Sequence, residues 1–268
     1  TLNSYYGDSI NSIEFSEEKR EPNPARLLRA YSQSASTLNL LRSFAQGGFA
    51  NLRKVNSWNM GFVKASKEGK KYEKIAAKIN EYLDFMDAVG VNTSTVIDLN
   101  TVEFFTSHEG LHLPYEAALT RVDSLTNEVY CTSAHFIWIG DRTRFIDSAH
   151  VEYCRGISNP IGIKCGPSLD PDELIKIIET INPTNEAGKI SLIFRYGEEN
   201  IDQHLPGLVE AITKNNKNVL WISDPMHGNT VKSSSGLKTR DFNSLLNETS
   251  KAIKILKQKG CHLGGIHL

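Results

Sequence analysis

The chain has 268 residues, of which 40% are hydrophobic and 23% are charged, a composition that excludes a disordered or fibrous protein and suffices for one large core. Its 30 basic and 31 acidic residues give a formal net charge of −1, which argues against nucleic acid or an anionic membrane as partner. No apolar stretch approaches the roughly 20 residues of a membrane-spanning helix. The four cysteines form no CxxC pair, which favours reduced thiols and a cytoplasmic protein. The chain begins with Thr1, so a plastid transit peptide upstream stays open.

The first 91 residues predict a polar arm followed by helices. Apolar residues recur at helical spacing from Pro24 to Gln46 and again from Lys67 to Val89, and a glycine follows each run. These patterns predict two amphipathic helices whose apolar faces pack inward. Three residues between them are expected to pack rather than to form a ligand cage: Val55, Trp58 and Phe62.

From residue 92 to residue 268, short apolar runs alternate with helical stretches. The expected strands are Glu103–Thr106, Ala134–Ile139, Ile161–Cys165, Ile190–Phe194, Val219–Ile222 and Gly265–Leu268. The expected helices are Tyr115–Arg121, Thr143–Arg155, Pro171–Ile181, Ile201–Asn215 and Phe242–Gln258. This alternation indicates an α/β fold of parallel βα units, either a doubly wound sheet or a (β/α)8 TIM barrel. No glycine-rich nucleotide-binding loop follows any strand, so we expect the barrel, incomplete here with about six of eight strands.

The segment WISDPMHGNT, residues 221–230, joins a buried strand to a polar turn. In a parallel barrel, the residues just past the carboxyl end of a strand form the rim of the active site. Asp224 and His227 are therefore expected to face a substrate, and a neutral imidazole there suits a divalent metal. The alternative is a turn in which Asp224 and Asn229 only satisfy backbone groups.

Three basic residues lie at the ends of successive expected strands, namely Arg142, Lys164 and Arg195. If their side chains converge, they would bind a small substrate that carries phosphate and carboxylate groups. The alternative is a charged rim in which these cations pair with nearby carboxylates, which are Glu109, Asp141 and Asp224.

Longer motifs carry a resemblance over nearly the whole chain. They are LLRAYSQSASTLNLLRSFAQGG, VNSWN, TSHEGLHLPYEAALTR, SAHFIWIGDRTRFIDSAHVEYCRGISNPIGIKCGP, FRYG, WISDPMHGNT, GLKTRDF and GGIHL. In these motifs the chain resembles the type II (plant-like) 3-deoxy-D-arabino-heptulosonate 7-phosphate (DAHP) synthases. The resemblance implies a metal-dependent barrel that condenses phosphoenolpyruvate with erythrose 4-phosphate in the first step of the shikimate pathway, toward chorismate and aromatic amino acids.

Carried over residue by residue, the resemblance also implies roles. Asp141 and Arg142 resemble the acidic and basic pair that binds phosphoenolpyruvate, where the family usually has glutamate before the arginine. Lys164 and Arg195 resemble the remaining phosphoenolpyruvate contacts, and Lys164 is a candidate general acid if neighbouring cations lower its pKa. His227 resembles a histidine metal ligand.

Further expectations rest on the same resemblance. Glu109 is expected in the same site, and Lys238 or Arg240 is expected to hold a phosphate. The divalent metal is expected to be Mn²⁺, with Co²⁺, Fe²⁺ or Zn²⁺ as alternatives, and the ligands other than His227 are expected outside these residues. We therefore expect the 268 residues alone to be inactive and poorly folded.

Several readings stay open at this point. The chain could be a non-catalytic barrel remnant or regulatory subunit, or another metal-dependent phosphosugar aldolase. As a DAHP synthase it is expected to form homo-oligomers, and it could partner a chorismate mutase. It could also serve a phenazine-type pathway.

Overall fold

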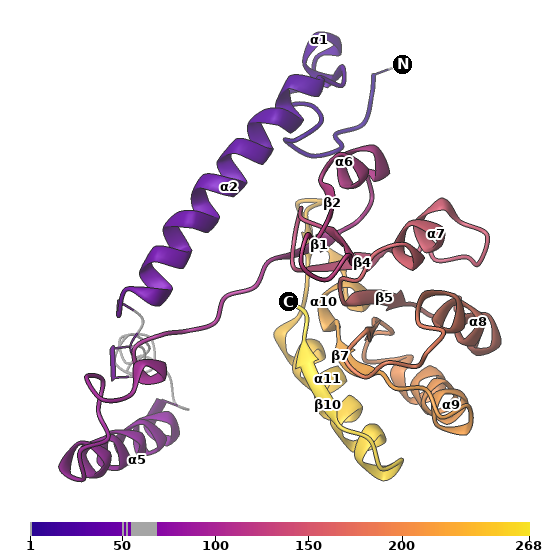
Figure 1. Ribbon diagram of the computed structural model, residues 1–268. Helices are drawn as coiled ribbons and strands as arrows, with labels where there is room; N and C mark the ends of the chain where they lie inside the picture. Colours follow the sequence, from indigo (N-terminus) through magenta and orange to yellow (C-terminus); the bar gives the residue numbers. More distant parts are fainter. Residues whose placement is uncertain (1, 50, 52, 55–68) are drawn as a thin grey trace. The chain divides into compact units, whose positions relative to one another are not determined.

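The computed structural model describes residues 2–49, 51, 53–54 and 69–268, and the chain divides into two compact units, Thr1–Phe104 and Phe105–Leu268 (Figure 1). The expected packing residues Val55, Trp58 and Phe62 lie outside the described residues. The boundary expected between residues 91 and 92 stays a prediction. Each unit is described below by itself.

The first unit is helical. It contains α1 (Glu17–Arg20), α2 (Pro24–Gln46), α5 (Gly69–Ala88) and the short 3-10 helix η1 (Ile97–Leu99). The α2 helix begins where the Asn23 side chain accepts a hydrogen bond from the backbone N–H of Ala25, and Pro24 occupies the first turn. Both features favour a helix start, and they explain why the sequence predicted the bounds of α2.

The inward packing expected for α2 is wrong for the described part of the chain. The described residues bury no side chain of α2, and Leu28 is 72% exposed. The α5 helix differs, because Ala76 and Leu83 are buried. The spacing of apolar residues therefore predicted the helix but not the surface that covers it, since periodicity carries no information about the partner.

The second unit is built on a parallel sheet of six strands, in the order β1-β4-β5-β6-β7-β10. The strands are β1 (Ser107–Glu109), β4 (Phe136–Ile139), β5 (Ile161–Cys165), β6 (Ile190–Phe194), β7 (Leu220–Ser223) and β10 (Leu263–Ile266). Every neighbouring pair is parallel. The order follows the chain, as in consecutive strands of a barrel, and the expected incomplete (β/α)8 barrel is confirmed.

The helices of this unit are α6 (Leu113–Ala118), α7 (Ala149–Arg155), α8 (Pro171–Ile181), α9 (Ile201–Lys214), α10 (Pro225–Gly228) and α11 (Phe242–Gln258). Four of them, α7, α8, α9 and α11, cover the outer face of the sheet and enclose the core, whereas the short α10 forms the turn after β7. Helices α7, α8, α9 and α11 follow one another side by side (Figure 1). All five residues of β5 and of β6 are buried, because helices cover one face and the barrel interior lies on the other.

Two short antiparallel hairpins interrupt the βα pattern: β2 (Thr120–Val122) with β3 (Val129–Cys131), and β8 (Val231–Lys232) with β9 (Lys238–Thr239). The expected helix Tyr115–Arg121 was therefore too long at its end, since Thr120 already pairs with Cys131. None of the helices in the described ranges is both long and apolar enough to cross a membrane.

Two other expected elements have bounds that differ by more than two residues from those of the structure. The first strand covers Ser107–Glu109 instead of 103–106, because the backbone pairing with β4 begins at Ser107 and Phe136. The helix expected from Thr143 begins at Ala149, since the Ser148 hydroxyl accepts from the N–H of Val151 and caps it. Polar side chains hid the position of the strand, and the helix cap lies inside a run of helical character. The apolar pattern therefore placed both starts too early in the chain.

Candidate active site at the carboxyl ends of the strands

A buried ion pair lies at the centre of the site. Nζ of Lys164, from β5, is 2.5 Å from Oδ2 of Asp224, and the side chains are 8% and 0% exposed. Asp224 follows β7 and also caps α10, since Oδ1 accepts from the N–H groups of Met226 and His227 at 3.2 Å. One carboxylate thus joins the ends of two strands.

The same carboxylate orients His227. Nδ1 of the imidazole lies 2.9 and 2.8 Å from the two oxygens of Asp224, and the side chain is 49% exposed. A carboxylate only accepts, so in the neutral imidazole the proton sits on Nδ1 and Nε2 keeps its lone pair. Asp224 therefore satisfies backbone N–H groups and also contacts two side chains of the site, Lys164 and His227. That it faces a substrate stays a prediction.

The charge of Asp224 follows from its partners. Burial raises the pKa of this carboxyl, but hydrogen bonds from Lys164 and His227 outweigh burial and hold the pKa below its ordinary value. Asp224 is therefore ionised at neutral pH. The charged neighbour of Lys164 is thus an anion, whereas the general-acid hypothesis invoked neighbouring cations.

Arg195 and Asp141 form the second part of the site. Nη1 of Arg195 is 3.9 Å from Oδ2 of Asp141, and Nη2 donates to the backbone oxygen of His227 at 3.5 Å. Nε of Arg195 is buried and finds no hydrogen-bond partner in the described chain. A buried donor without a partner is costly, so this guanidinium is suited to an added anion.

Asp141 is held by two further donors. Its Oδ1 accepts from Nε of Arg144 at 3.0 Å and from the N–H of Gly166 at 3.0 Å. The sequence did not single out Arg144, which is 5% exposed. The motif GDRTR offers two arginines, and only the fold of the loop decides which one turns back to the aspartate.

Glu109 lies at the end of β1 against the backbone of Gly140. A Cβ atom at Gly140 would be 2.1 Å from Oε1 of Glu109. The absence of a side chain at Gly140 is therefore what allows this carboxylate to lie beside the loop that carries Asp141.

The structure brings five of the predicted residues into one chain of contacts: Asp141, Lys164, Arg195, Asp224 and His227. Arg142 is exposed, and no hydrogen bond or ion pair joins it to another described residue. Lys238 is exposed on β9. Arg240 contacts the site turn, because its Nε donates to the backbone oxygen of Met226 at 3.0 Å.

Besides Arg144, the sequence analysis missed two further residues of the site. His267 follows β10, and its ring centroid is 4.9 Å from that of Trp138 and 6.4 Å from that of His227. Trp138 also faces Lys164, whose Nζ is 5.6 Å from the ring centroid. The rule that strand ends carry the chemistry applies equally to the motif GGIHL and could have identified His267.

One side chain of the site, His227, is oriented so that it could bind a metal ion. Because Asp224 engages Nδ1, Nε2 of His227 is free to bind a divalent ion, an arrangement common among metal-binding histidines. The described residues contain no group of three or more His, Cys, Asp or Glu side chains placed to hold a metal. His227 thus fits as one ligand of a set that needs others.

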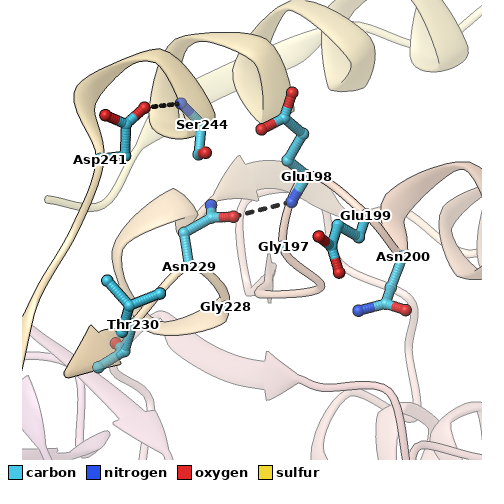
Figure 2. Close-up of a pocket in the computed structure, with 10 residues that line it drawn as sticks. Gly197, Glu198, Glu199, Asn200, Gly228, Asn229, Thr230, Asp241 and Ser244 are labelled. Carbon is cyan, nitrogen blue, oxygen red and sulfur yellow. Dashed lines mark hydrogen bonds between the residues drawn. The ribbon is translucent and has the colours of Figure 1, made fainter.

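A cavity of about 270 Å³ is lined by the turns after β6 and β7 (Figure 2). Its lining includes Glu198, Asn229 and Asp241, and Figure 2 shows Oδ1 of Asn229 accepting from the N–H of Glu198 at 2.9 Å. None of the predicted site residues lines this cavity. It borders the turns after β6 and β7 that carry Arg195 and His227.

Fold and site together define a (β/α)8-type protein with charged side chains at the carboxyl ends of its strands. The sequence profile described as the Class-II DAHP synthetase family matches residues 1–268. The chain belongs to this family.

Curated relatives agree with this assignment. The chain is 49% identical over 268 residues to a phospho-2-dehydro-3-deoxyheptonate aldolase of Streptomyces coelicolor, covering 100% of this chain and 59% of that protein. It is 43% identical over 281 residues to the protein of that name from Neurospora crassa, with 99% and 58% covered. The phospho-2-dehydro-3-deoxyheptonate aldolase AroG of Mycolicibacterium smegmatis is 40% identical over 272 residues, with 100% and 58% covered. The chain therefore spans less than two thirds of these relatives.

Proposed function

We propose that the protein containing this chain is a DAHP synthase. In the proposed reaction, carbon 3 of phosphoenolpyruvate bonds to the aldehyde carbon of erythrose 4-phosphate and water adds to carbon 2. The bond between carbon 2 and the phosphate oxygen then breaks, which releases inorganic phosphate. The observation that carries the proposal is the contact chain of Lys164, Asp224, His227 and Arg195 in a member of this family.

Phosphoenolpyruvate carries a phosphate and a carboxylate, and the site offers cations for both. The unpartnered Nε of Arg195 supports a role of this guanidinium in holding one of these groups. Lys164 would supply the second cation, and Arg142 would join them when substrate is bound. Erythrose 4-phosphate would place its phosphate near Arg240 or Lys238, and the bond from Arg240 to Met226 supports Arg240.

The chain's own residues would also manage protons. Lys164, held beside Asp224, would donate a proton to the aldehyde oxygen as the new carbon–carbon bond forms. Nε2 of His227 would hold the metal, for which we propose Mn²⁺. When bound, a divalent ion of this kind supplies Lewis-acid polarisation of a carbonyl oxygen.

The test uses the full-length protein. We expect loss of phosphoenolpyruvate only when metal and erythrose 4-phosphate are both present, and its abolition in His227→Ala. The matched control is His262→Ala, an exposed histidine before β10, which should keep wild-type turnover. A folded protein without turnover under any divalent metal would instead support a non-catalytic remnant or regulatory subunit. A different product would support another phosphosugar aldolase.

The remaining expectations concern the whole protein. Large exposed apolar side chains on α2 and α5, including Leu28 and Phe85 at 72% and 67% exposure, support a homo-oligomer or further protein surface over these helices. Light scattering on the full-length protein tests the oligomer. A cytoplasmic or plastid location, a chorismate mutase partner and the choice of pathway stay predictions.

A further inference from the structure

A buried carboxylate outside the substrate site links the two turns that carry Arg195 and His227. Glu248 of α11 is 0% exposed. Its Oε1 accepts from the N–H of Gly197 at 3.0 Å, and its Oε2 accepts from Nδ2 of Asn229 at 2.6 Å. Among the described residues, no basic side chain forms an ion pair with it. The interactions of Glu248 are therefore with amide donors, which is unusual for a buried carboxyl.

The two residues that it holds sit directly beside the site. Gly197 follows Arg195 by two residues, and Asn229 follows His227 by two residues. The turns touch through their backbones, since a Cβ atom at Gly228 would be 2.3 Å from the nitrogen of Gly197. The spacing between these turns is thus set by backbone contact and by the bonds to Glu248.

The orientation of the Asn229 amide is fixed from three sides. Its Oδ1 accepts from the N–H of Glu198 at 2.9 Å, and its Nδ2 donates to the backbone oxygen of Pro225 at 2.8 Å as well as to Glu248. Flipping the amide would set an oxygen against an oxygen and an NH₂ group against an N–H. The neighbour at position 248 must therefore present acceptors to both Asn229 and Gly197.

We propose that Glu248 is a positioning residue for the reaction, which holds Arg195 and His227 at the correct spacing through Gly197 and Asn229. This inference rests on the proposed function. Burial raises the pKa of Glu248, and the N–H groups of Gly197 and Tyr196 and the amide of Asn229 oppose this rise. An uncharged side chain would avoid the cost of burying the carboxylate but would give up at least one of its two acceptor oxygens.

The first variant changes one acceptor into a donor without changing size. In Glu248→Gln, the new NH₂ group must face Asn229 or Gly197, both of which donate. We expect kcat/KM for phosphoenolpyruvate and the affinity for Mn²⁺ to fall about 10- to 100-fold, the usual cost of losing a supporting contact behind a metal ligand. Mn²⁺ affinity is measured without substrates by isothermal titration calorimetry.

A second variant reverses the polarity of the bond. In Glu248→Gln/Asn229→Asp, the new amide can donate to the new carboxylate, which still accepts from Glu198, although the bond to Pro225 is lost. We expect the double variant to recover at least about tenfold in kcat/KM relative to Glu248→Gln. If Glu248→Gln does not fold, Asn229→Ala removes the same bond from the partly exposed side and should show the same losses.

The control separates positioning from stability. Asn182 is a buried amide at the end of α8, 4% exposed, with 2.9 Å bonds to the N–H and the oxygen of Glu186. Asn182→Ala should lower the melting temperature while keeping kinetic constants and Mn²⁺ affinity.

Two outcomes overturn the inference in an active wild-type protein: unchanged kcat/KM and Mn²⁺ affinity in Glu248→Gln, or a double variant no better than that single variant. A wild-type protein without turnover would instead overturn the proposed function, and the Mn²⁺ affinities would then still test the inference.

Discussion

Asp224 accepts hydrogen bonds from two side chains and two backbone N–H groups, so its replacement is expected to affect both stability and the metal site. Removing one partner of a buried pair leaves the other charge unpaired, at a cost of about 3–5 kcal/mol. We predict that Asp224→Asn loses about this much free energy of unfolding, and that Mn²⁺ affinity falls about 10- to 100-fold as His227 loses its orientation. Urea unfolding and metal titration measure the two effects.

The control for this variant is a partly exposed ion pair. Lys217 Nζ is 2.7 Å from Oε1 of Glu179, whose side chain is 54% exposed. Glu179→Gln should change the free energy of unfolding by about 1 kcal/mol or less. Equal effects of the two substitutions would contradict the role given to the buried pair.

A second buried carboxylate gives a prediction about pH. Glu116 of α6 is 2% exposed, and its oxygens bond to Nε2 of His108 at 2.7 Å and to Oγ of Ser133 at 2.5 Å. Burial raises the pKa of Glu116, but these bonds hold it below its ordinary value. Ionisation of Glu116 therefore stabilises the fold above that value.

This stabilisation should disappear on acidification. Because the folded protein has the lower pKa, the contribution of Glu116 is complete above its ordinary pKa of 4.5 and is lost as the pH falls below it. We predict that the free energy of unfolding of the wild type falls more steeply from about pH 5 to about pH 3 than that of Glu116→Gln. Parallel curves for both proteins would contradict the assignment.

At the scale of elements, the contact between the turns after β6 and β7 decides the shape of the site. Gly197 has φ of 83°, a conformation that favours glycine, and a Cβ at Gly228 would lie 2.3 Å from the nitrogen of Gly197. We predict that Gly228→Ala pushes the turns apart and lowers kcat/KM by at least about tenfold. Steady-state kinetics on the full-length protein measure this loss.

The matched control is another glycine of the same unit. A Cβ at Gly207, inside α9, would meet no atom within 4 Å. Gly207→Ala should therefore raise the free energy of unfolding by about 0.5–1 kcal/mol with unchanged kinetics. A Gly228→Ala protein with wild-type kcat/KM would show that the contact between the turns does not matter for the reaction.

The elements also show what the sequence could predict. Helix α8 carries Pro171 at its start and buried apolar residues at helical spacing, so its bounds were predicted correctly. Strand β1 is Ser-His-Glu and has no apolar run, so only its backbone pairing with β4 reveals it. Local patterns predict elements that bury an apolar face, and they miss elements that the tertiary pairing of the sheet imposes.

The same limit applies to the site. Lys164, Arg195 and His227 were predictable because each lies at or just beyond a strand end. The bond of Asp141 to Gly166, and those of Glu248 to Gly197 and Asn229, join residues of different loops or elements. No spacing rule along the chain predicts such contacts.

At the scale of the whole molecule, a chain that belongs to the class-II DAHP synthetase family carries one chain of polar contacts at the strand ends of a six-stranded parallel sheet. Cations at the strand ends would bind two phosphorylated substrates, although the net charge of the chain is only −1. Local placement of charge, and not its total, thus supports the proposed chemistry.

The most direct test of this account is the mass of the product made by the full-length protein from phosphoenolpyruvate labelled with ¹³C at carbon 3 and unlabelled erythrose 4-phosphate. We predict a seven-carbon sugar acid phosphate that retains the label, with release of one inorganic phosphate for each molecule formed. Lys164→Met should make this product at least about 100-fold more slowly. Pyruvate as the labelled product, or undiminished turnover of Lys164→Met, would contradict the account.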